Sequence, residues 1–140
     1  MQIVNLCYKF TIQFKSNTFE SKQDFMAYDI TLANKVRAYL YTFNNLEIEE
    51  KKMFRGLTFM VNGKMCVCVS GEKLMCRFDP ALYEEVAEKK GFEQMTMKGN
   101  QYKGYCYVEP TGFQNKKDFY YWINLCIAFN ERAKSSKKKG

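Results

Sequence analysis

The chain of 140 residues contains no histidine, only two prolines and one tryptophan. The missing histidine excludes Ser-His and Cys-His pairs, so covalent catalysis would need a cysteine activated by a lysine, an arginine or a helix end. No cysteine in the sequence is singled out in this way. The glycine-containing stretches also lack the form of a phosphate-cradling loop before a helix. We therefore predict no enzymatic activity, no catalytic residue and no cofactor-binding residue.

Acidic residues cluster at one point of the sequence, at Glu47, Glu49 and Glu50. Two lysines, Lys51 and Lys52, follow this cluster directly. Such a mixture of charges is typical of a solvated segment, and we do not expect it to act as a catalytic acid–base pair.

Long apolar runs and long linkers are missing as well. The apolar stretches fall short of the roughly 20 residues that a membrane-spanning helix needs, and Lys9, Gln13 and Lys15 interrupt the first 19 residues where a secretion signal would be apolar. The length suits one domain with its own core. We expect a cytoplasmic protein without a membrane partner, in which the six cysteines stay reduced and serve as small buried residues.

The stretch "NGKMCVCVSG" resembles a reactive site more than any other part of the chain. Side chains alternate along a strand, so the sequence predicts Cys66 and Cys68 on one face of a sheet, with Met65, Val67 and Val69 on the other. Two side chains that point the same way, about 6.6 Å apart along the strand, are poorly placed for a mutual disulfide.

A zinc site at this position would need two further ligands. The available cysteines, Cys76 and Cys106, stand at spacings from Cys66 and Cys68 that match no compact zinc template. We predict sheet thiols here and no metal site.

The net charge is +7, but it is unevenly distributed. Residues 1–25 carry +1, residues 26–133 carry +2, and residues 134–140 carry +4. We expect this last segment to be a disordered basic tail whose attraction to nucleic acid is nonspecific and salt-sensitive. The candidate nucleic-acid or partner contacts are the following cations: Lys51, Lys52, Arg55, Lys103, Lys137, Lys138 and Lys139.

The pattern of apolar residues and turn signals predicts an α+β domain. A helical period covers residues 28–43, with Asp29 as its cap, and Asn62-Gly63 predicts a tight hairpin. Asp79-Pro80 begins a second helix that Gly91 ends. The expected strands are residues 56–61, 64–69, 74–78, 92–97 and 103–108, and the last helix covers residues 116–132. The order α-β-β-β-α-β-β-α favours two layers, with helices on an antiparallel five-stranded sheet.

The last helix is apolar over more than half of its circumference. Either neighbouring segments cover the excess, or it forms an interface with a protein partner or a second copy of the chain. The candidate interface residues are Tyr105, Tyr107, Trp122 and Phe129. Tyr105 and Tyr107 share one face of a strand near Lys103, so base stacking on nucleic acid is the alternative interpretation of these two.

Four short motifs, in this order, identify a family resemblance. They are Lys-x-Met-Phe-x-Gly at residues 51–56, Asn-Gly-Lys-Met at 62–65, Leu-x-x-Arg at 74–77 and Lys-Gly-aromatic-x-Tyr-Val at 103–108. Together they resemble the N-terminal domain of the TfoX/Sxy family of bacterial competence regulators over about residues 26–132. The family usually has a second glycine where this chain has Arg55, and the arginine and proline of its Thr-Gly-Arg-Pro-Met-Lys-Gly loop are absent from residues 98–104.

The resemblance implies an antiparallel sheet with helices and transfers no catalytic residue. Its best-known members activate competence genes with the cyclic-AMP receptor protein and carry a second, C-terminal domain, whereas we expect this chain to be a stand-alone N-terminal domain. Members commonly begin near the equivalent of Met26, which implies that residues 1–25 are an upstream extension, 26–133 the domain and 134–140 the tail. The alternation in "YKFTIQF" leaves open a genuine extra strand.

Two functions follow as hypotheses. The first is a non-enzymatic binding or regulatory module, linked to competence or transcription through protein contacts, with a homodimer as one form that these contacts could take. The second is a nucleic-acid-associated regulator that uses the basic residues and the lysine tail, and a thiol or metal enzyme built on Cys66 and Cys68 ranks behind both.

Overall fold

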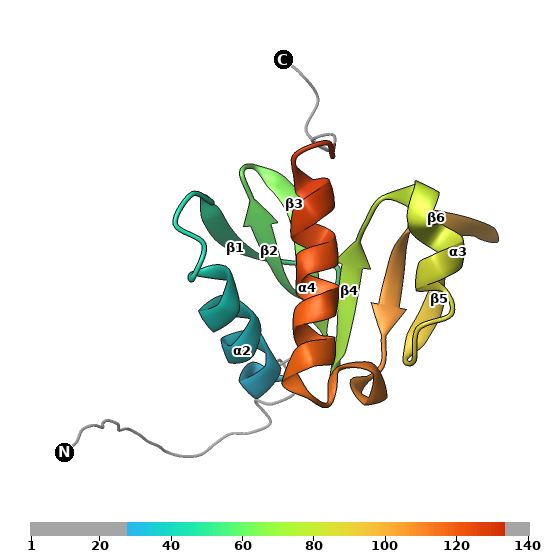
Figure 1. Ribbon diagram of the computed structural model, residues 1–140, viewed down its shortest axis with the longest axis horizontal. Helices are drawn as coiled ribbons and strands as arrows, with labels where there is room; N and C mark the ends of the chain where they lie inside the picture. Colours follow the sequence, from blue (N-terminus) through green and yellow to red (C-terminus); the bar gives the residue numbers. More distant parts are fainter. Residues whose placement is uncertain (1–27, 134–140) are drawn as a thin grey trace.

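The computed structural model describes residues 28–133 of the chain. Three helices and six strands follow one another in this range (Figure 1). In chain order they are α2 (Ile30–Leu40), β1 (Ile48–Met53), β2 (Gly56–Val61), β3 (Lys64–Ser70), β4 (Lys73–Arg77), α3 (Tyr83–Val86), β5 (Phe92–Met97), β6 (Asn100–Val108) and α4 (Lys116–Asn130). Short 3₁₀ helices, η1 (Pro80–Leu82) and η2 (Pro110–Phe113), precede α3 and α4. The predicted extension and basic tail lie outside the described residues.

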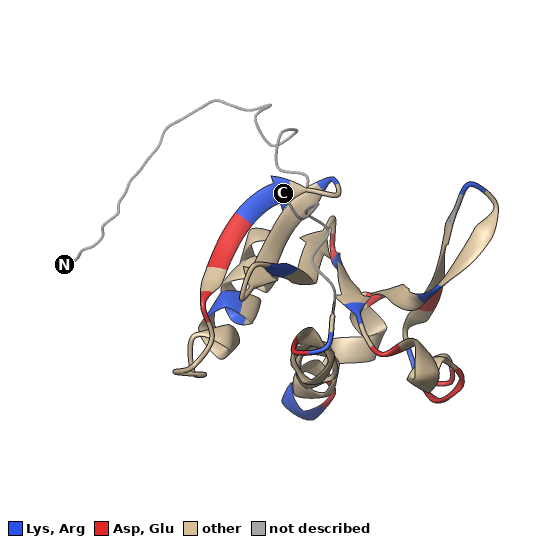
Figure 2. Ribbon diagram, turned by 90° about the horizontal axis from the view of Figure 1, so that it is seen from above, with Lys and Arg blue, Asp and Glu red and all other residues tan. Residues whose placement is uncertain are grey.

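The strands form one antiparallel sheet in the order β1-β2-β3-β4-β6-β5. The described helices lie on one face of this sheet, with α4 near its middle and α2 beside it toward β1 (Figures 1 and 2). The predicted α+β class and antiparallel pairing are therefore confirmed. The predicted number of five strands is wrong, because the sheet has six.

The additional strand is β1, which the sequence predicted as a solvated charged segment. It pairs with β2 along its whole length, from Ile48 opposite Val61 to Met53 opposite Gly56. Its sequence is IEEKKM, and it occupies the edge of the sheet. Charged side chains suit an edge strand because they discourage pairing with another chain, and the same charges hide the alternation that marks a strand.

Aspartate side chains cap two helices at the residues that the sequence predicted. Asp29 caps α2, accepting hydrogen bonds from the amides of Thr31 and Leu32 at 2.9 and 3.1 Å. Asp79 accepts from the amide of Ala81 at 3.0 Å, although the helix that follows breaks into η1 and α3 and ends at Val86, well before Gly91. Both caps satisfy amides that would otherwise lack a partner at a helix start.

The hairpin at Asn62-Gly63 is confirmed, with φ angles of 51° and 81° at these two residues. The ladder beyond it is irregular, because Met60 pairs with Met65 while Phe59 pairs with Val67. Cys66 is the extra residue between these two pairs, so the register shifts there by one.

This bulge overturns the predicted facing of the two cysteines. Cys66 packs in the helix-side core with Val67 and Val69, whereas Met65 and Cys68 lie in the cluster on the opposite face. Strict alternation holds only along a regular strand, and one inserted residue reverses the facing of every side chain on one side of it.

The helix-side core joins α2, α4 and the strands. Trp122 is 1% exposed, and its indole N–H donates to the carbonyl oxygen of Gly112 at 3.0 Å. At the C-terminal end of α4, the side-chain amide of Asn130 donates to the carbonyl oxygen of Val61 at 3.1 Å. The α4 helix is therefore fixed to η2 at one point and to the β2–β3 hairpin at another.

The opposite face of the sheet carries a second buried cluster of strand residues. It consists of Met60, Met65, Cys68, Met75 and Met95, with Tyr105 and Tyr107 packed against it. Methionine side chains fill irregular spaces well because they are unbranched and flexible. We call this surface the methionine face.

Candidate functional site

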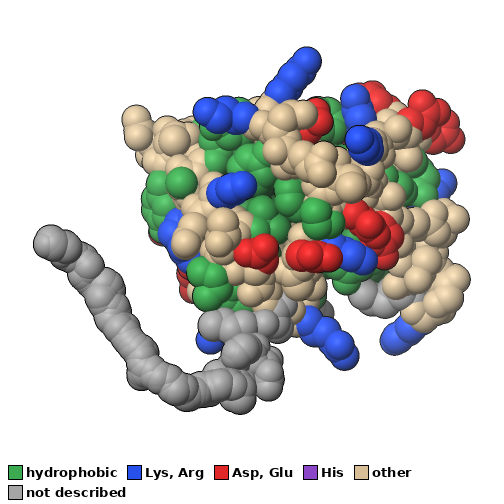
Figure 3. Space-filling view, turned by 90° about the horizontal axis from the view of Figure 1, so that it is seen from below, with side chains coloured by type: hydrophobic (Ala, Val, Ile, Leu, Met, Phe, Trp, Pro, Cys, Tyr) green, Lys and Arg blue, Asp and Glu red, His purple; other side chains and the backbone are tan. Residues whose placement is uncertain are grey.

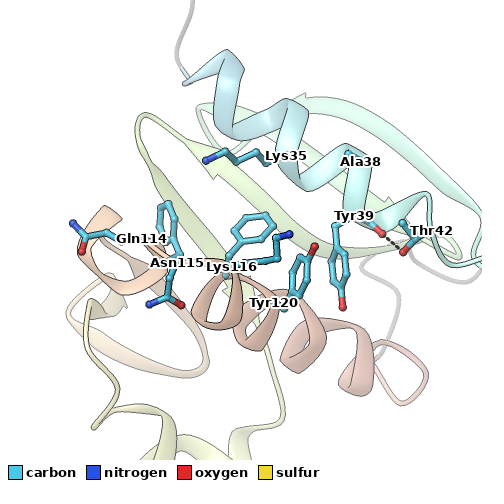
Figure 4. Close-up of a pocket in the computed structure, with 10 residues that line it drawn as sticks. Lys35, Ala38, Tyr39, Thr42, Gln114, Asn115, Lys116 and Tyr120 are labelled. Atoms are coloured by element: carbon cyan, nitrogen blue, oxygen red, sulfur yellow. Dashed lines mark hydrogen bonds between the residues drawn. The ribbon is translucent and has the colours of Figure 1, made fainter.

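A groove separates α2 from the first half of α4 and has a volume of about 430 Å³ (Figure 4). Its walls come from α2, from the residues just after it, from η2 and from the start of α4. The residues that line it are Lys35, Ala38, Tyr39, Thr42, Phe113, Gln114, Asn115, Lys116, Phe119 and Tyr120. We call this feature the α2–α4 groove.

Aromatic rings form the floor of the groove. The rings of Tyr39 and Tyr120 stack with centroids 4.0 Å apart and planes at 11°. The Phe119 ring lies 6.5 Å from Tyr39 and 6.4 Å from Phe113, in both cases edge to face. These are favourable geometries for aromatic pairs, so the floor holds its shape.

A hydrogen bond between the two helices also holds the Tyr39 ring of the floor in place. The hydroxyl of Tyr39 on α2 donates to Oδ1 of Asn124 on α4 at 2.8 Å. At the entrance to α4, Oδ1 of Asn115 accepts from the amide of Asp118 at 2.8 Å, and its Nδ2 donates to Oδ2 of Asp118 at 3.1 Å. Asn115 therefore caps α4 and fixes the position of its first turn. Phe119 and Tyr120, whose rings belong to the floor, follow directly after that turn.

Two lysines, Lys35 from α2 and Lys116 from α4, supply the charge of the groove (Figure 4). No acidic side chain is among the residues that line it. Both lysines are exposed, and neither has an ion pair or a hydrogen bond to another side chain within residues 28–133. The arrangement suits binding, since it combines an apolar floor with two available cations and contains no pair of groups for acid–base chemistry.

Sequence reasoning did not find this groove. The helical period of residues 28–43 marks Tyr39 as part of an apolar face, but its partners Phe119 and Tyr120 lie some 80 positions later. A signal existed in the excess of aromatic residues at the start of the last helix. The groove depends on how far α2 and α4 approach each other, which the pattern of either helix alone does not specify.

The predicted basic contacts do not form one patch. Lys51 and Lys52 lie on the edge strand β1 and Arg55 lies in the turn after it, all exposed. Lys103 lies on β6, four strand positions from β1, which is about 19 Å at the usual strand spacing. Its ammonium group lies 5.5 Å from the ring centroid of Tyr83. The remaining candidates, Lys137, Lys138 and Lys139, are outside the described residues.

The predicted interface residues are also separated. Trp122 is 1% exposed in the helix-side core, so in this fold it presents almost no surface to a partner. Tyr105 and Tyr107 are half-buried on the methionine face, and Phe129 is half-buried on α4. The guanidinium of Arg77 lies within 6 Å of the ring centroids of both Tyr105 and Phe129.

The excess apolar surface of the last helix is covered. Tyr120 packs against Tyr39 of α2 on one flank, and on the other the ammonium group of Lys89 lies 4.7 Å from the ring centroid of Tyr121. The large apolar side chains exposed within residues 28–133 are on other elements: Ile30, Tyr41, Phe54 and Tyr102. Neighbouring segments therefore cover much of the apolar surface of α4, while Tyr120 remains half-buried at the α2–α4 groove.

The described cysteines are buried and free. Burial raises the pKa of the Cys68 thiol to about 11 and raises the pKa of Cys66 and Cys76 well above the usual thiol value. Such thiols are poor nucleophiles at neutral pH because the thiolate is scarce. Within residues 28–133, no group of three or more potential ligands is arranged to hold a metal ion.

One known protein family matches the sequence of this chain. The family model described as the TfoX N-terminal domain matches residues 39–130. The chain belongs to the TfoX N-terminal domain family. Searches of curated proteins and of solved structures found no match.

The family motifs of this TfoX N-terminal domain occupy turns and strands of the sheet, not the groove. The motif at residues 51–56 forms the β1–β2 turn, and the motif at 62–65 forms the β2–β3 turn. Within the motif at 103–108, the carbonyl oxygen of Gly104 accepts from the amide of Phe78 at 2.9 Å, and a Cβ at Gly104 would lie 3.2 Å from the Pro80 ring. These motifs therefore specify the fold of the TfoX N-terminal domain. No described helix has the length and apolar character needed to cross a bilayer.

Proposed function

We propose that this TfoX N-terminal domain is a non-enzymatic binding module that acts through protein contacts, and that the α2–α4 groove is its contact surface. The observation that carries the proposal is the groove itself, which leaves an aromatic floor accessible between two helices. Its volume of about 430 Å³ lies within the usual range for binding sites.

The electrostatics support the same proposal. Three cations of the domain are paired with acids, Arg37 with Glu50, Lys73 with Glu93 and Arg132 with Asp79, whereas many of its exposed lysines form no ion pair within residues 28–133. In the groove, Lys35 and Lys116 stand without such partners within residues 28–133. Charges that the fold does not use for itself remain available to a ligand.

The family supports a regulatory role at the level of the domain. We propose that the contacts serve regulation of the competence or transcription type, in which a small domain acts by recruiting or modulating another protein. This role needs a binding surface and no catalytic group.

Site-specific photo-crosslinking tests the proposal. A benzophenone amino acid replaces Ala38, which lines the groove and is exposed, and in a matched variant it replaces Gln101, which is exposed on β6. We expect irradiation in the native cell to give a discrete adduct from position 38 that position 101 does not give. The same adducts from both positions, or none from position 38, would contradict the proposal.

One observation favours the second function, association with nucleic acid. The β1–β2 turn exposes Phe54 between cations, with Lys52 before it and Arg55 after it. An aromatic side chain among cations is a platform on which bases stack.

The nucleic-acid hypothesis is tested with duplex and single-stranded DNA by fluorescence anisotropy over a range of salt concentrations. Binding that survives removal of residues 134–140 and is lost in Arg55→Glu would support it. Binding that disappears with residues 134–140 would show only nonspecific attraction to phosphates and would count against it.

A further inference from the structure

We infer that the α2–α4 groove takes an acidic segment of a partner protein, with an apolar side chain on the aromatic floor and carboxylates beside Lys35 and Lys116. This inference rests on the proposed function, because it names the chemistry of the partner at the same site. It commits to a peptide segment as the occupant.

The charge of the groove favours an acidic occupant. Ten residues line the groove, and the only charged ones are Lys35 and Lys116. Figure 4 shows them extending from different helices, Lys35 from α2 and Lys116 from α4, where the Lys116 side chain lies among the aromatic rings. Two cations that share a groove repel each other, so an occupant with carboxylates near both is favoured over a neutral or basic one.

The apolar part of the groove favours an occupant that also has an apolar side chain. Tyr39 and Tyr120 present a stacked pair of rings, and Phe113 adds a third half-buried ring toward η2. A partner that offered only charge would leave these rings in contact with water. An aromatic or branched aliphatic side chain would cover them, and such anchors dominate the affinity of peptide sites.

The position of the groove decides between a peptide and a second copy of the chain. In Figure 3 the molecule is seen from the end at which α2 and α4 begin, and hydrophobic side chains reach the surface there among both basic and acidic side chains. A second copy docked through the same groove would bring its own Lys35 and Lys116 toward those of the first copy. An acidic segment is complementary in both charge and polarity, and a groove between two helices is a common receptor for short amphipathic segments.

The test uses synthetic peptides and the full chain. The probe is a ten-residue peptide in which glutamates flank a central phenylalanine and leucine. In one control peptide glutamine replaces every glutamate, and in another serine replaces the two apolar residues. Titration into isotopically labelled protein reports both affinity and location through backbone amide shifts. We expect the largest shifts at residues 35–42 and 113–120, and weaker binding of both control peptides.

Matched charge reversals separate a specific site from general attraction. Lys116→Glu and Lys35→Glu each lower the association constant by about tenfold or more, while Lys117→Glu changes it by less than about twofold. Lys117 is the control because it follows Lys116 on α4, is exposed and does not line the groove. All three variants change the net charge equally, and circular dichroism checks that each remains folded.

Three results would overturn the inference. They are no binding at about 1 mM peptide, equal losses in Lys116→Glu and Lys117→Glu, or shifts centred outside the groove. Crosslinking from position 38 then shows whether only the acidic partner is rejected or the proposed function as well. A specific adduct whose yield is unchanged by Lys35→Glu and Lys116→Glu keeps the proposed function and rejects the acidic partner, whereas no adduct rejects both.

Discussion

At the scale of single residues, Gly56 shows how closely the sheet is built. A Cβ at this position would lie 2.0 Å from the carbonyl oxygen of Val69, and the neighbouring contacts are also backbone atoms. The backbone of Val69 has little freedom to withdraw because this residue pairs with Leu57 of β2 and with Leu74 of β4. Gly56 is therefore needed for its lack of a side chain, in the same family motif that forms the β1–β2 turn.

We predict that Gly56→Ala lowers the free energy of unfolding by about 3 kcal/mol or more, because the added methyl group overpacks the β2–β3 ladder. The matched variant is Gly63→Ala. Gly63 has a φ angle of 81° and no atom within 4 Å of its Cβ position, so only the cost of the left-handed backbone, about 1 kcal/mol, is expected there. Urea denaturation measures both, and equal losses would contradict the steric explanation.

Arg55 presents the opposite case, a side chain where glycine would fit better. Phe54 and Arg55 have φ angles of 57° and 60°, in the left-handed region that disfavours residues with a Cβ. We predict that Arg55→Gly raises the free energy of unfolding by about 0.5 to 1 kcal/mol, the relief of strain being partly offset by the greater freedom of glycine when unfolded. The control Lys52→Gly, within β1, should lower it. A loss of stability in Arg55→Gly would show that the side chain contributes more than the strain costs.

The Cys68 thiol predicts a pH dependence of stability. Its folded-state pKa is raised from 9.0 to about 11 because it is buried. Between these values the unfolded chain loses the thiol proton and the folded chain keeps it, so the free energy of unfolding falls as pH rises from 9 to about 11. We expect Cys68→Ala to reduce this slope, measured by urea denaturation at several pH values. An unchanged slope would assign the effect to other groups.

At the scale of elements, the edge strand β1 is tied to α2 by one ion pair with two hydrogen bonds. Nε of Arg37 donates to Oε2 of Glu50 at 2.6 Å, and Nη2 donates to Oε1 at 2.8 Å. The pair is partly exposed, with side-chain exposures of 36% and 26%. A two-pronged contact of this kind orients the helix on the strand more than it adds stability.

We predict that Glu50→Gln lowers the free energy of unfolding by about 0.5 to 1 kcal/mol at neutral pH. The hydrogen bond from Arg37 lowers the pKa of Glu50, so the contribution is present above the usual carboxyl pKa of 4.5 and is lost as pH falls through the folded-state value. The matched variant is Glu49→Gln, on the same strand without an ion pair to a described residue. Thermal unfolding between pH 3 and 7 compares them, and similar behaviour of the two variants would contradict the prediction.

The elements differ in how far the sequence could predict them. Asn62-Gly63, Asp29 and Asp79 act through local chemistry, so the hairpin and the two caps were predicted at the observed residues. The β1 strand was missed because a charged edge strand has no apolar alternation. The bulge at Cys66 was missed because it is a property of the pairing of β2 with β3, not of either strand.

The candidate site was predicted least well, for a related reason. The motifs that identified the family specify turns and close backbone approaches, and these determine the fold. The groove arises where Tyr39 meets Tyr120, two residues far apart in the sequence, at a distance set by the whole helix layer. Sequence patterns reveal which face of a helix is apolar, but they do not reveal where two helices pack incompletely and leave a groove between them.

At the scale of the whole molecule, the sequence left a homodimer open as an alternative. It was based on the apolar surface of the last helix, which α2 and the segment around Lys89 cover. We therefore expect sedimentation at micromolar concentration to give a monomer of 16.6 kDa. A dimer that persists on dilution would show that another surface serves as the interface.

The two walls of the α2–α4 groove are anchored unequally. The α4 helix is fastened along its length, by Trp122 to η2 and by Asn130 to the β2–β3 hairpin. The α2 helix buries one face in the core, and its polar contacts to the sheet are the hydrogen bond of its cap residue Asp29 to Gly71 and a partly exposed ion pair to an edge strand. We therefore expect an occupant too large for the groove to displace α2 outward and to leave α4 in place. A spin label on each helix would record such an opening as a longer distance between labels and a displaced β1.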